Sequence, residues 1–248
     1  MDAYIFYRWT NMGMDFPDLS KLSLKLSLRD DWLNACGRRP DFKSWKNVRG
    51  KNKRILLHHY AARADDDVET GGDYLSAYDQ MDIDEILERN TYSVEHVVPR
   101  SHIYGKNSGP GENDPIGWIE ATRAANSRRS NYPLYLWPNP DGTIAPPNTL
   151  VTVDNELHYV PPSEQRGRLA RKWLFIRATY TGIQPPSAAQ RNRAAEIVAL
   201  AQYGQIQPAE RRVNRDYRRR LGWANPLLEY GAERWYGDAE WLALVFGR

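Results

Sequence analysis

Three side chains of the kinds that hydrolytic enzymes use lie within a short stretch of this sequence. Glu95 and His96 are adjacent and precede a Val-Val-Pro run that ends at Pro99, and Asn126 follows thirty residues after His96. Carboxylate and amide oxygens are ligands suited to Mg²⁺, which keeps several waters and binds substrate phosphates. Histidine has the unperturbed pKa nearest neutrality, so His96 can take a proton from water. Together these groups could hydrolyse a phosphodiester bond.

Arginine residues accompany this stretch. Arg129 lies three residues after Asn126, and a guanidinium can hold a phosphate through two parallel hydrogen bonds. Arg100 and Arg128 lie beside the same two segments. A Glu-His pair alone is weak evidence, because a histidine on a strand more often makes a structural hydrogen bond. The prediction therefore depends on the motifs that surround these residues.

The order and spacing of the motifs resemble the endonuclease I family of ββα-metal (His-Me finger) nucleases. That family carries Glu-His, an apolar pair and proline, and later an Asn-x-x-Arg-x-Asn segment followed by an aromatic residue. Two further segments look like its Arg-Gly-x-apolar-Ala-Arg helix and its Glu-x-x-Asn and Asn-Pro elements. The matching segments here are Glu95–Pro99, Asn126–Tyr132, Arg166–Arg171, Glu210–Arg215 and Asn225–Leu227. The histidines that usually precede the family's asparagine are absent, and Asp114–Gly117 stands there instead.

The resemblance implies a metal-dependent endonuclease that uses Mg²⁺, with Mn²⁺ or Ca²⁺ as substitutes, and leaves 5′-phosphate ends. It makes His96 the general base and Arg129 a second catalytic residue that braces the phosphate or the active-site loop. Glu95 and Asn126 would hold the metal, directly or through water. For Arg171, a phosphate contact and a buried ion pair both stay open. The other expected residues are Arg100, Arg128 and Arg168 for substrate binding, and Asn131 and Pro99 as structural residues near the site.

Sequence patterns predict the elements that position these residues. Tyr92–Val98 is rich in β-branched residues and stops at Pro99, which predicts a strand that runs into a loop. Trp118–Ser127 suits a helix, so a strand would deliver the Glu-His pair and a helix the asparagine. Helices and short strands without βαβ alternation predict an α+β fold. We expect a ββα-metal core embedded in a mostly helical single domain.

The rest of the chain is predicted mainly from capping residues and apolar spacing. Residues 1–50 would be an extension of unknown role, 51–230 the nuclease domain, and 231–248 a helical tail. Trp235 and Trp241 make this tail a candidate surface for a protein partner. The other expected elements are a strand at Leu22–Leu28, helices at Ile55–Arg63, Asp82–Arg89, Arg168–Tyr180 and Asp238–Phe246, a capping box at Ser187 and Gln190 for a helix ending before Gly204, a helix from Pro208 to Gly222, and a hairpin turn at Asp141-Gly142 between Leu134–Trp137 and Thr143–Ile144.

The formal net charge of +3 hides an asymmetry along the chain. Residues 65–90 hold ten acidic side chains and one basic one, whereas residues 160–220 hold thirteen Lys or Arg against four acids. A basic segment can be the footprint of a polyanion, or a set of solvated helix faces. The same choice applies to Arg218–Arg220 at a predicted helix end. The expected partner is DNA, with RNA as an alternative.

Composition limits the compartment. The single cysteine, Cys36, excludes a disulfide framework and a multi-cysteine zinc site. The sequence contains no run of about 18 apolar residues, so it predicts no transmembrane helix. The N-terminus lacks the pattern of a secretory signal. We therefore expect no membrane partner and an intracellular protein, in the cytoplasm of a bacterium or of an infected host cell. Secreted members of the family often have several cysteines, so the lone cysteine favours an intracellular relative from a phage or large DNA virus.

Two alternatives stay open, one from a different class and one of the same chemistry. One is a catalytically silent, nuclease-like module that binds DNA without metal. The other is a site-specific or mobile-element (homing-type) endonuclease of the same chemistry, in which residues 1–50 and the basic run Lys43–Arg54 provide specificity. The sequence indicates no oligomeric state.

Overall fold

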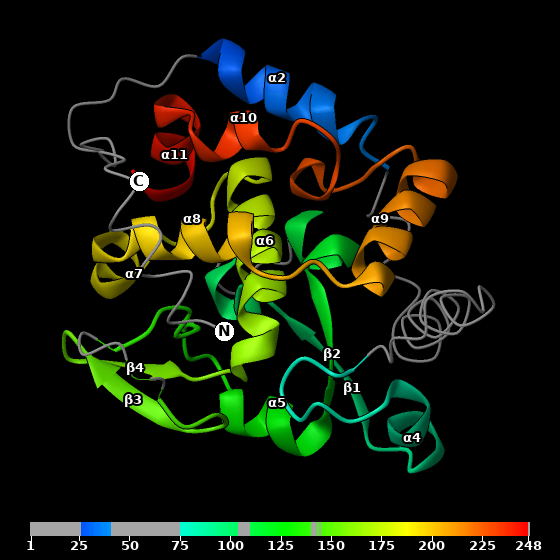
Figure 1. Ribbon diagram of the computed structural model, residues 1–248, viewed down its shortest axis with the longest axis vertical. Coiled ribbons are helices and arrows are strands. Elements are labelled where there is room, and N and C mark those ends of the chain that lie inside the picture. The colour runs from blue at the N-terminus through cyan, green and yellow to red at the C-terminus, as the bar shows by residue number, and fades with distance from the viewer. Residues whose placement is uncertain (1–25, 41–74, 104–109, 140–142, 144, 248) are drawn as a thin grey trace.

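The computed structural model describes residues 26–40, 75–103, 110–139, 143 and 145–247, and it shows helices arranged around one central helix, with two small sheets below them (Figure 1). Both sheets are two-stranded and antiparallel. The predicted α+β class is confirmed. The helix predicted at Ile55–Arg63 and the basic run Lys43–Arg54 lie outside the described residues.

The helices and strands follow one another in the order helix, helix, two strands with a helix after the second, a hairpin, and then helices to the end. Their bounds are α2 Leu26–Cys36, α4 Ile83–Glu88, β1 Tyr92–His96, β2 Trp118–Thr122, α5 Arg123–Arg129, β3 Leu150–Val153, β4 Glu156–Tyr159, α6 Ser163–Thr179, α7 Ala188–Asn192, α8 Ala194–Tyr203, α9 Pro208–Leu221, α10 Glu233–Tyr236 and α11 Ala239–Phe246. Short 3₁₀ turns lie at Arg100–His102, Pro110–Asn113, Pro115–Gly117 and Pro226–Leu228.

Helix α6 is the central element. Every residue of it from Gln165 to Thr179 is buried. It contacts α8, α2 and α11, which surround it in Figure 1. Gly167 on α6 allows a close approach to α8, because a Cβ there would lie 3.1 Å from the Cα of Gly204. A helix buried on all sides must find partners for its polar side chains inside the protein.

The described parts of both flanking segments pack into the same core as α6. Trp32 of α2 is completely buried, and its indole N–H donates to Thr179 Oγ1 at 3.0 Å. Its ring centroid lies 5.0 Å from that of Trp235 and 5.3 Å from that of Trp241. These two tail residues are 4% and 0% exposed, so the prediction that they contact a protein partner is wrong: this chain's own core covers them. The boundaries at residues 50 and 230 stay a prediction.

Strands β1 and β2 and helix α5 form a continuous strand–strand–helix unit. The strands pair in register from Tyr92 opposite Thr122 to His96 opposite Trp118. Thr122 ends β2 and caps α5, because its hydroxyl accepts the backbone N–H of Ala125 at 3.2 Å. The helix predicted over Trp118–Ser127 is therefore wrong in its first half. Pairing with β1 overrides the local helix pattern there, and the helix starts only after the threonine.

Two other predictions of strands also fail. Leu26 and Leu28 lie in α2, so the alternating pattern of Leu22–Leu28 does not form a strand in its described part. The segment 134–137 is not a strand; only Leu134 forms an isolated parallel bridge, with Tyr159. The turn predicted at Asp141-Gly142 lies outside the described residues. A hairpin is present further on, where Asp154 and Asn155 have φ of 50° and 63° between β3 and β4. Two residues of positive φ give the tight turn that suits a hairpin.

Predictions based on capping residues are confirmed. Ser187 and Gln190 form the capping box at the start of α7, and α8 ends before Gly204, although Arg193 interrupts the helix between them. Helix α9 starts at Pro208 and ends before Gly222, whose φ is 63°. The helices predicted at 82–89, 168–180 and 238–246 are present as α4, α6 and α11.

Candidate active site

The face of β1 that carries Ser93 and Glu95 is covered by α5. The amide nitrogen of Asn126 donates to the hydroxyl of Ser93 at 2.8 Å. One turn further along α5, the guanidinium of Arg129 is ion-paired with Glu95. Since Asn126 and Arg129 are three residues apart, they lie on one face of the helix and meet strand residues two apart on one face of the sheet. The structure therefore brings Glu95 and Asn126 to a shared interface.

Arg129 serves this interface from inside the protein. Its side chain is 0% exposed, and besides Glu95 it donates to the carbonyls of Val97 at 3.1 Å and Ser130 at 3.4 Å. A guanidinium without exposed surface cannot reach a substrate phosphate. The prediction that Arg129 holds the phosphate is thus corrected to its other predicted role, in which it braces the strand end that follows Glu95.

Glu95 is a mostly buried carboxylate with one strong partner. Burial raises the pKa of its carboxyl above the ordinary value, while the positive charge of Arg129 and a backbone hydrogen bond oppose that rise. Its side chain is 10% exposed, so it is not sealed from solvent as Arg129 is.

His96 is held by a backbone carbonyl from the loop before β2. Its Nε2 lies 2.9 Å from the carbonyl oxygen of Glu112, which also accepts the indole N–H of Trp118 at 2.9 Å. A carbonyl can only accept, so Nε2 carries the hydrogen, and the neutral ring has its lone pair on Nδ1. The ring of Trp118 stands edge-on to the imidazole, with 6.5 Å between ring centroids. His96 is therefore fixed in one tautomer and one orientation.

The three predicted reactive residues do not all share one face. Successive side chains of a strand point to opposite sides, so His96 lies across the strand from Glu95 and on the side of Trp118. His96 is also the last residue of β1. A phosphate that contacts His96 and a metal held by Glu95 would have to lie past the strand end, beside Pro99. Pro99 is buried and its carbonyl accepts the backbone N–H of His102 at 2.8 Å, which starts the next turn.

The other predicted site residues on this unit lie at its surface. Arg100 is 58% exposed and is ion-paired with the carboxylate of Glu112 at 2.6 Å. Arg128 and Asn131 are exposed. The end of α5 is closed by the N–H of Ser130, which donates to the carbonyl of Asn126 at 2.9 Å. Arg100 and Arg128 therefore have surface on which a phosphate could bind.

Arg168 and Arg171 lie inside the protein and offer no surface to a phosphate. Arg171 is 0% exposed and makes two hydrogen bonds with Glu210, at 2.9 and 2.7 Å, and others with the carbonyls of Ala201, Gly204 and Gln205. Arg168 is 1% exposed and is ion-paired with Glu120 of β2. Of the two roles for Arg171, the structure shows the buried ion pair, and the prediction that Arg168 binds substrate is wrong for the same reason.

Burial of basic side chains also changes how the basic segment of residues 160–220 is interpreted. Lys172 is buried, donates to the carbonyls of Ile116 and Trp118, and burial lowers its pKa to about 8. The basic side chains of α6 therefore bind carboxylates and backbone carbonyls inside the protein instead of facing a polyanion. The buried basic side chains of α6 are Arg166, Arg168, Arg171, Lys172 and Arg177.

Three residues of this region were missed from the sequence. Ser93 orients Asn126, and its position two residues before Glu95 on a predicted strand could have revealed it. Glu112 and Trp118 orient His96 through a loop whose path has no local sequence signal. That loop is anchored by the buried carboxylate of Asp114, which accepts from Tyr180 at 2.7 Å and from Trp223 at 3.0 Å.

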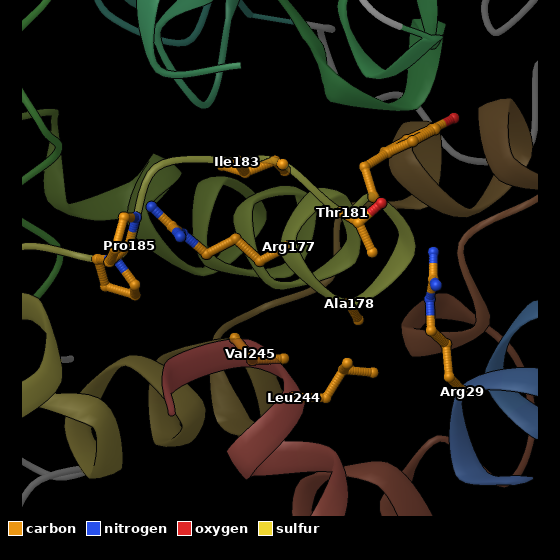
Figure 2. A pocket seen from close by; sticks show the side chains of 11 residues that line it. Arg29, Arg177, Ala178, Thr181, Ile183, Pro185, Leu244 and Val245 are labelled. Atoms are coloured by element: carbon orange, nitrogen blue, oxygen red, sulfur yellow. The ribbon is translucent and has the colours of Figure 1, made fainter. Parts of the chain in front are cut away.

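A cavity of about 30 Å³ lies away from this unit, at the end of α6 beside α2 and α11 (Figure 2). Arg177 reaches from α6 toward Pro185 there and donates to the carbonyl of Gln184 at 2.9 Å. Its guanidinium also stacks over Trp173, 4.4 Å from the ring centroid. The cavity has room for about two waters and not for a nucleotide, and it contains none of the predicted site residues.

Within the described part of the chain, no group of three or more His, Cys, Asp or Glu side chains could hold a metal, and no helix is long and apolar enough to cross a membrane. A carboxylate and an amide are two oxygen ligands, and Mg²⁺ commonly binds through one or two carboxylates together with waters. The donor set of Glu95 and Asn126 fits that chemistry.

No family model matches the chain, and no curated protein matches it. The resemblance to the endonuclease I family therefore rests on the four motifs, and membership stays a prediction.

Proposed function

We propose that this protein is a Mg²⁺-dependent endonuclease that hydrolyses phosphodiester bonds of DNA and is built on a ββα-metal core formed by β1, β2 and α5. The observation that carries the proposal is the strand–strand–helix unit itself. It joins Glu95 on the first strand to the helix that bears Asn126, and it holds His96 at the end of that strand. A strand that bears the Glu-His pair and a helix that bears the asparagine agree with the expectation from the sequence, and a second strand takes the place of the first half of the expected helix.

His96 is the general base. With its Nε2 hydrogen donated to the carbonyl of Glu112, the neutral ring has its lone pair on Nδ1, which is the atom that would take the proton from water. The carbonyl also stabilises the imidazolium that forms when Nδ1 takes the proton, because the Nε2–H bond then becomes charge-assisted. Trp118 shares this carbonyl and keeps it in place.

Glu95 and Asn126 would hold the metal, for which Mn²⁺ or Ca²⁺ can substitute. Ser93 accepts the amide N–H of Asn126, which leaves the amide oxygen for the ion. Arg129 fixes Glu95 through one carboxylate oxygen and is a positioning residue. When bound, the ion supplies positive charge that neutralises the phosphate and the leaving 3′ oxygen, so that products carry 5′-phosphates.

Plasmid cleavage by the purified full chain tests the proposal. We expect nicking in Mg²⁺, none with excess EDTA, and recovery when Mg²⁺ or Mn²⁺ is added back. His96→Gln retains a donor for the carbonyl of Glu112 but provides no base at neutral pH, so cleavage should fall at least 10²-fold while the thermal midpoint is nearly unchanged. Cleavage by His96→Gln at the wild-type rate, or cleavage that resists EDTA, would refute the proposal.

The metal ligands are tested by a matched pair of variants. Asn126→Ala removes the amide oxygen and should weaken Mg²⁺ binding, measured by calorimetry in the absence of DNA. Asn126→Asp retains an oxygen ligand and adds negative charge, so it should bind the ion at least as tightly as the wild type. Equal affinity of both variants would contradict the assignment of Asn126. Metal-independent DNA binding without cleavage by the wild type would favour the silent module.

A further inference from the structure

Helix α9 presents a row of arginines to solvent. Arg211, Arg215 and Arg219 follow one another at four-residue steps, and all three are exposed. Residues four apart lie on one side of a helix, so these three form a single line. With a rise of 1.5 Å per residue, the line is about 12 Å long. We call these three residues the α9 row.

The row retains most of its positive charge. Arg219 is ion-paired with Asp216 at 2.7 Å, but its side chain is 70% exposed, and such surface pairs contribute little. Arg211 and Arg215 form no ion pair with any described residue. The one other acid of α9, Glu210, is buried in its pair with Arg171.

The triplet Arg218–Arg220, which the sequence offered as a possible polyanion contact, is less available to a partner than this row. Arg218 is ion-paired with Glu229 at 2.7 Å, and it also donates to the carbonyls of Ala35 and Cys36 at 2.7 and 2.6 Å. It therefore ties α9 to the end of α2. Arg220 lies 4.0 Å from Asp216. The positions that stay open to a partner are spaced along the helix instead of adjacent in sequence.

The start of α9 lies against the strands of the candidate site. Ala209 packs in one apolar cluster with Tyr92 of β1 and Trp118 of β2, and Trp118 is the residue paired with His96. Figure 1 shows α9 rising from the side of β1 and β2. The α9 row therefore starts next to the strand pair that carries the proposed base.

We propose that the α9 row binds the phosphate backbone of the DNA duplex beside the candidate site and so provides affinity without sequence specificity. This inference rests on the proposed function, because it assigns DNA as the partner. Each strand of a duplex carries about one charge per 3.4 Å of the axis, so a line of about 12 Å spans roughly three to four phosphates of one strand. Arginine suits this role, since its planar fork matches phosphate oxygens.

A membrane surface fits the row less well. A helix that lies on a bilayer buries an apolar face among the lipids and keeps its basic residues on the other. The apolar side chains of α9, such as Ala209 and Tyr217, are buried inside this protein. The exposed face offers guanidinium groups and no apolar anchor.

Binding of a fluorescent duplex of about 20 base pairs, measured in EDTA in a His96→Gln background, tests the inference. The test variant is Arg211→Ala/Arg215→Ala. The matched control is Arg191→Ala/Arg193→Ala, which removes the same charge from the region of α7, at the opposite side of the structure (Figure 1). A third variant, Arg211→Lys/Arg215→Lys, keeps the charge on α9.

The salt dependence is the decisive measurement. Loss of two phosphate contacts should reduce the slope of log affinity against log salt by about 1.8. The ratio of dissociation constants, variant to wild type, should then shrink about tenfold between 50 and 200 mM salt. The control and the lysine variant should retain a slope near that of the wild type. Circular dichroism should show all variants folded, because Arg191, Arg211 and Arg215 are exposed and Arg193 is half-buried in an ion pair with Glu196 of the next turn.

Three outcomes would overturn the inference: an unchanged slope in the test variant, an equal change in test and control variants, and binding to phosphatidylserine vesicles that depends on the row while DNA binding does not. Because binding is measured under conditions that prevent cleavage, the test of the α9 row does not depend on whether the protein is a nuclease. A wild type that binds through the row but never cuts would contradict the proposed enzyme and leave the α9 surface in place.

Discussion

The ion pair between Arg129 and Glu95 offers the sharpest test of how the candidate site is held together. Arg129→Met retains much of the volume of the side chain and removes its charge, which leaves Glu95 buried without a cation. Breaking a buried pair in this way costs about 3–5 kcal/mol of folding free energy. Since a domain is stable by only about 5–15 kcal/mol, the loss is large and easily measured.

The loss of folding free energy in Arg129→Met should depend on pH. Burial already raises the pKa of Glu95 above the ordinary value of 4.5, and Arg129 opposes the rise, so removal of Arg129 raises that pKa further. Between the unfolded and folded pKa values, the folded state binds a proton that the unfolded chain has released. Stability therefore falls as pH rises through this window, and no penalty applies below the unfolded value. The destabilisation by Arg129→Met should be largest at pH 7 and smaller at pH 5.

Urea denaturation followed by tryptophan fluorescence at pH 5, 6 and 7 measures the effect. The control is Glu95→Gln/Arg129→Met, which removes the stranded charge and should recover about 2 kcal/mol or more at pH 7. Arg129→Lys keeps a charge but lacks the planar fork, so it should lie between the two. A loss below about 1 kcal/mol for Arg129→Met, or the same loss at pH 5 and pH 7, would refute the reasoning.

Two further predictions concern the surroundings of the site. Lys172 has a pKa of about 8 when folded and 10.5 when unfolded, so between these values the unfolded chain binds more protons and stability rises with pH. Relative to Lys172→Met, the wild type should gain about 1.5 kcal/mol between pH 8 and 9.5 in urea titrations, and a flat difference would contradict the assigned burial. Thr122→Ala removes the cap of α5 and should cost about 1 kcal/mol, whereas Thr122→Ser should cost less. Equal losses in thermal melts of the two variants would argue against the cap.

The sequence predicts well those features that depend on neighbours along the chain. The capping box at Ser187, the helix from Pro208 to Gly222 and the strand that ends before Pro99 are set by local hydrogen bonds and by residues with restricted backbones. The pairing of Asn126 with the first strand is also visible from the motifs, although its contact is Ser93 and not a reactive residue.

What the sequence does not predict depends on contacts between distant segments. Trp118–Thr122 forms a strand because β1 pairs with it, which no local pattern shows. The charges of Arg168 and Arg171 point to a polyanion until their partners are known, and Glu120 and Glu210 lie 48 and 39 residues away. Likewise, the carbonyl that orients His96 belongs to a loop residue 16 positions later.

Helix α6 has a consequence for how the chain assembles. Glu120, which neutralises Arg168, precedes the helix in the sequence, and Glu210, which neutralises Arg171, follows it. Neither half of the chain can bury α6 alone without leaving an unpaired guanidinium inside. A core in which both guanidinium groups of α6 are paired with a carboxylate therefore requires α9 as well as β2. A fragment that stops before α9 would retain every residue of the strand–strand–helix unit and still lack the charge that lets the helix behind it pack.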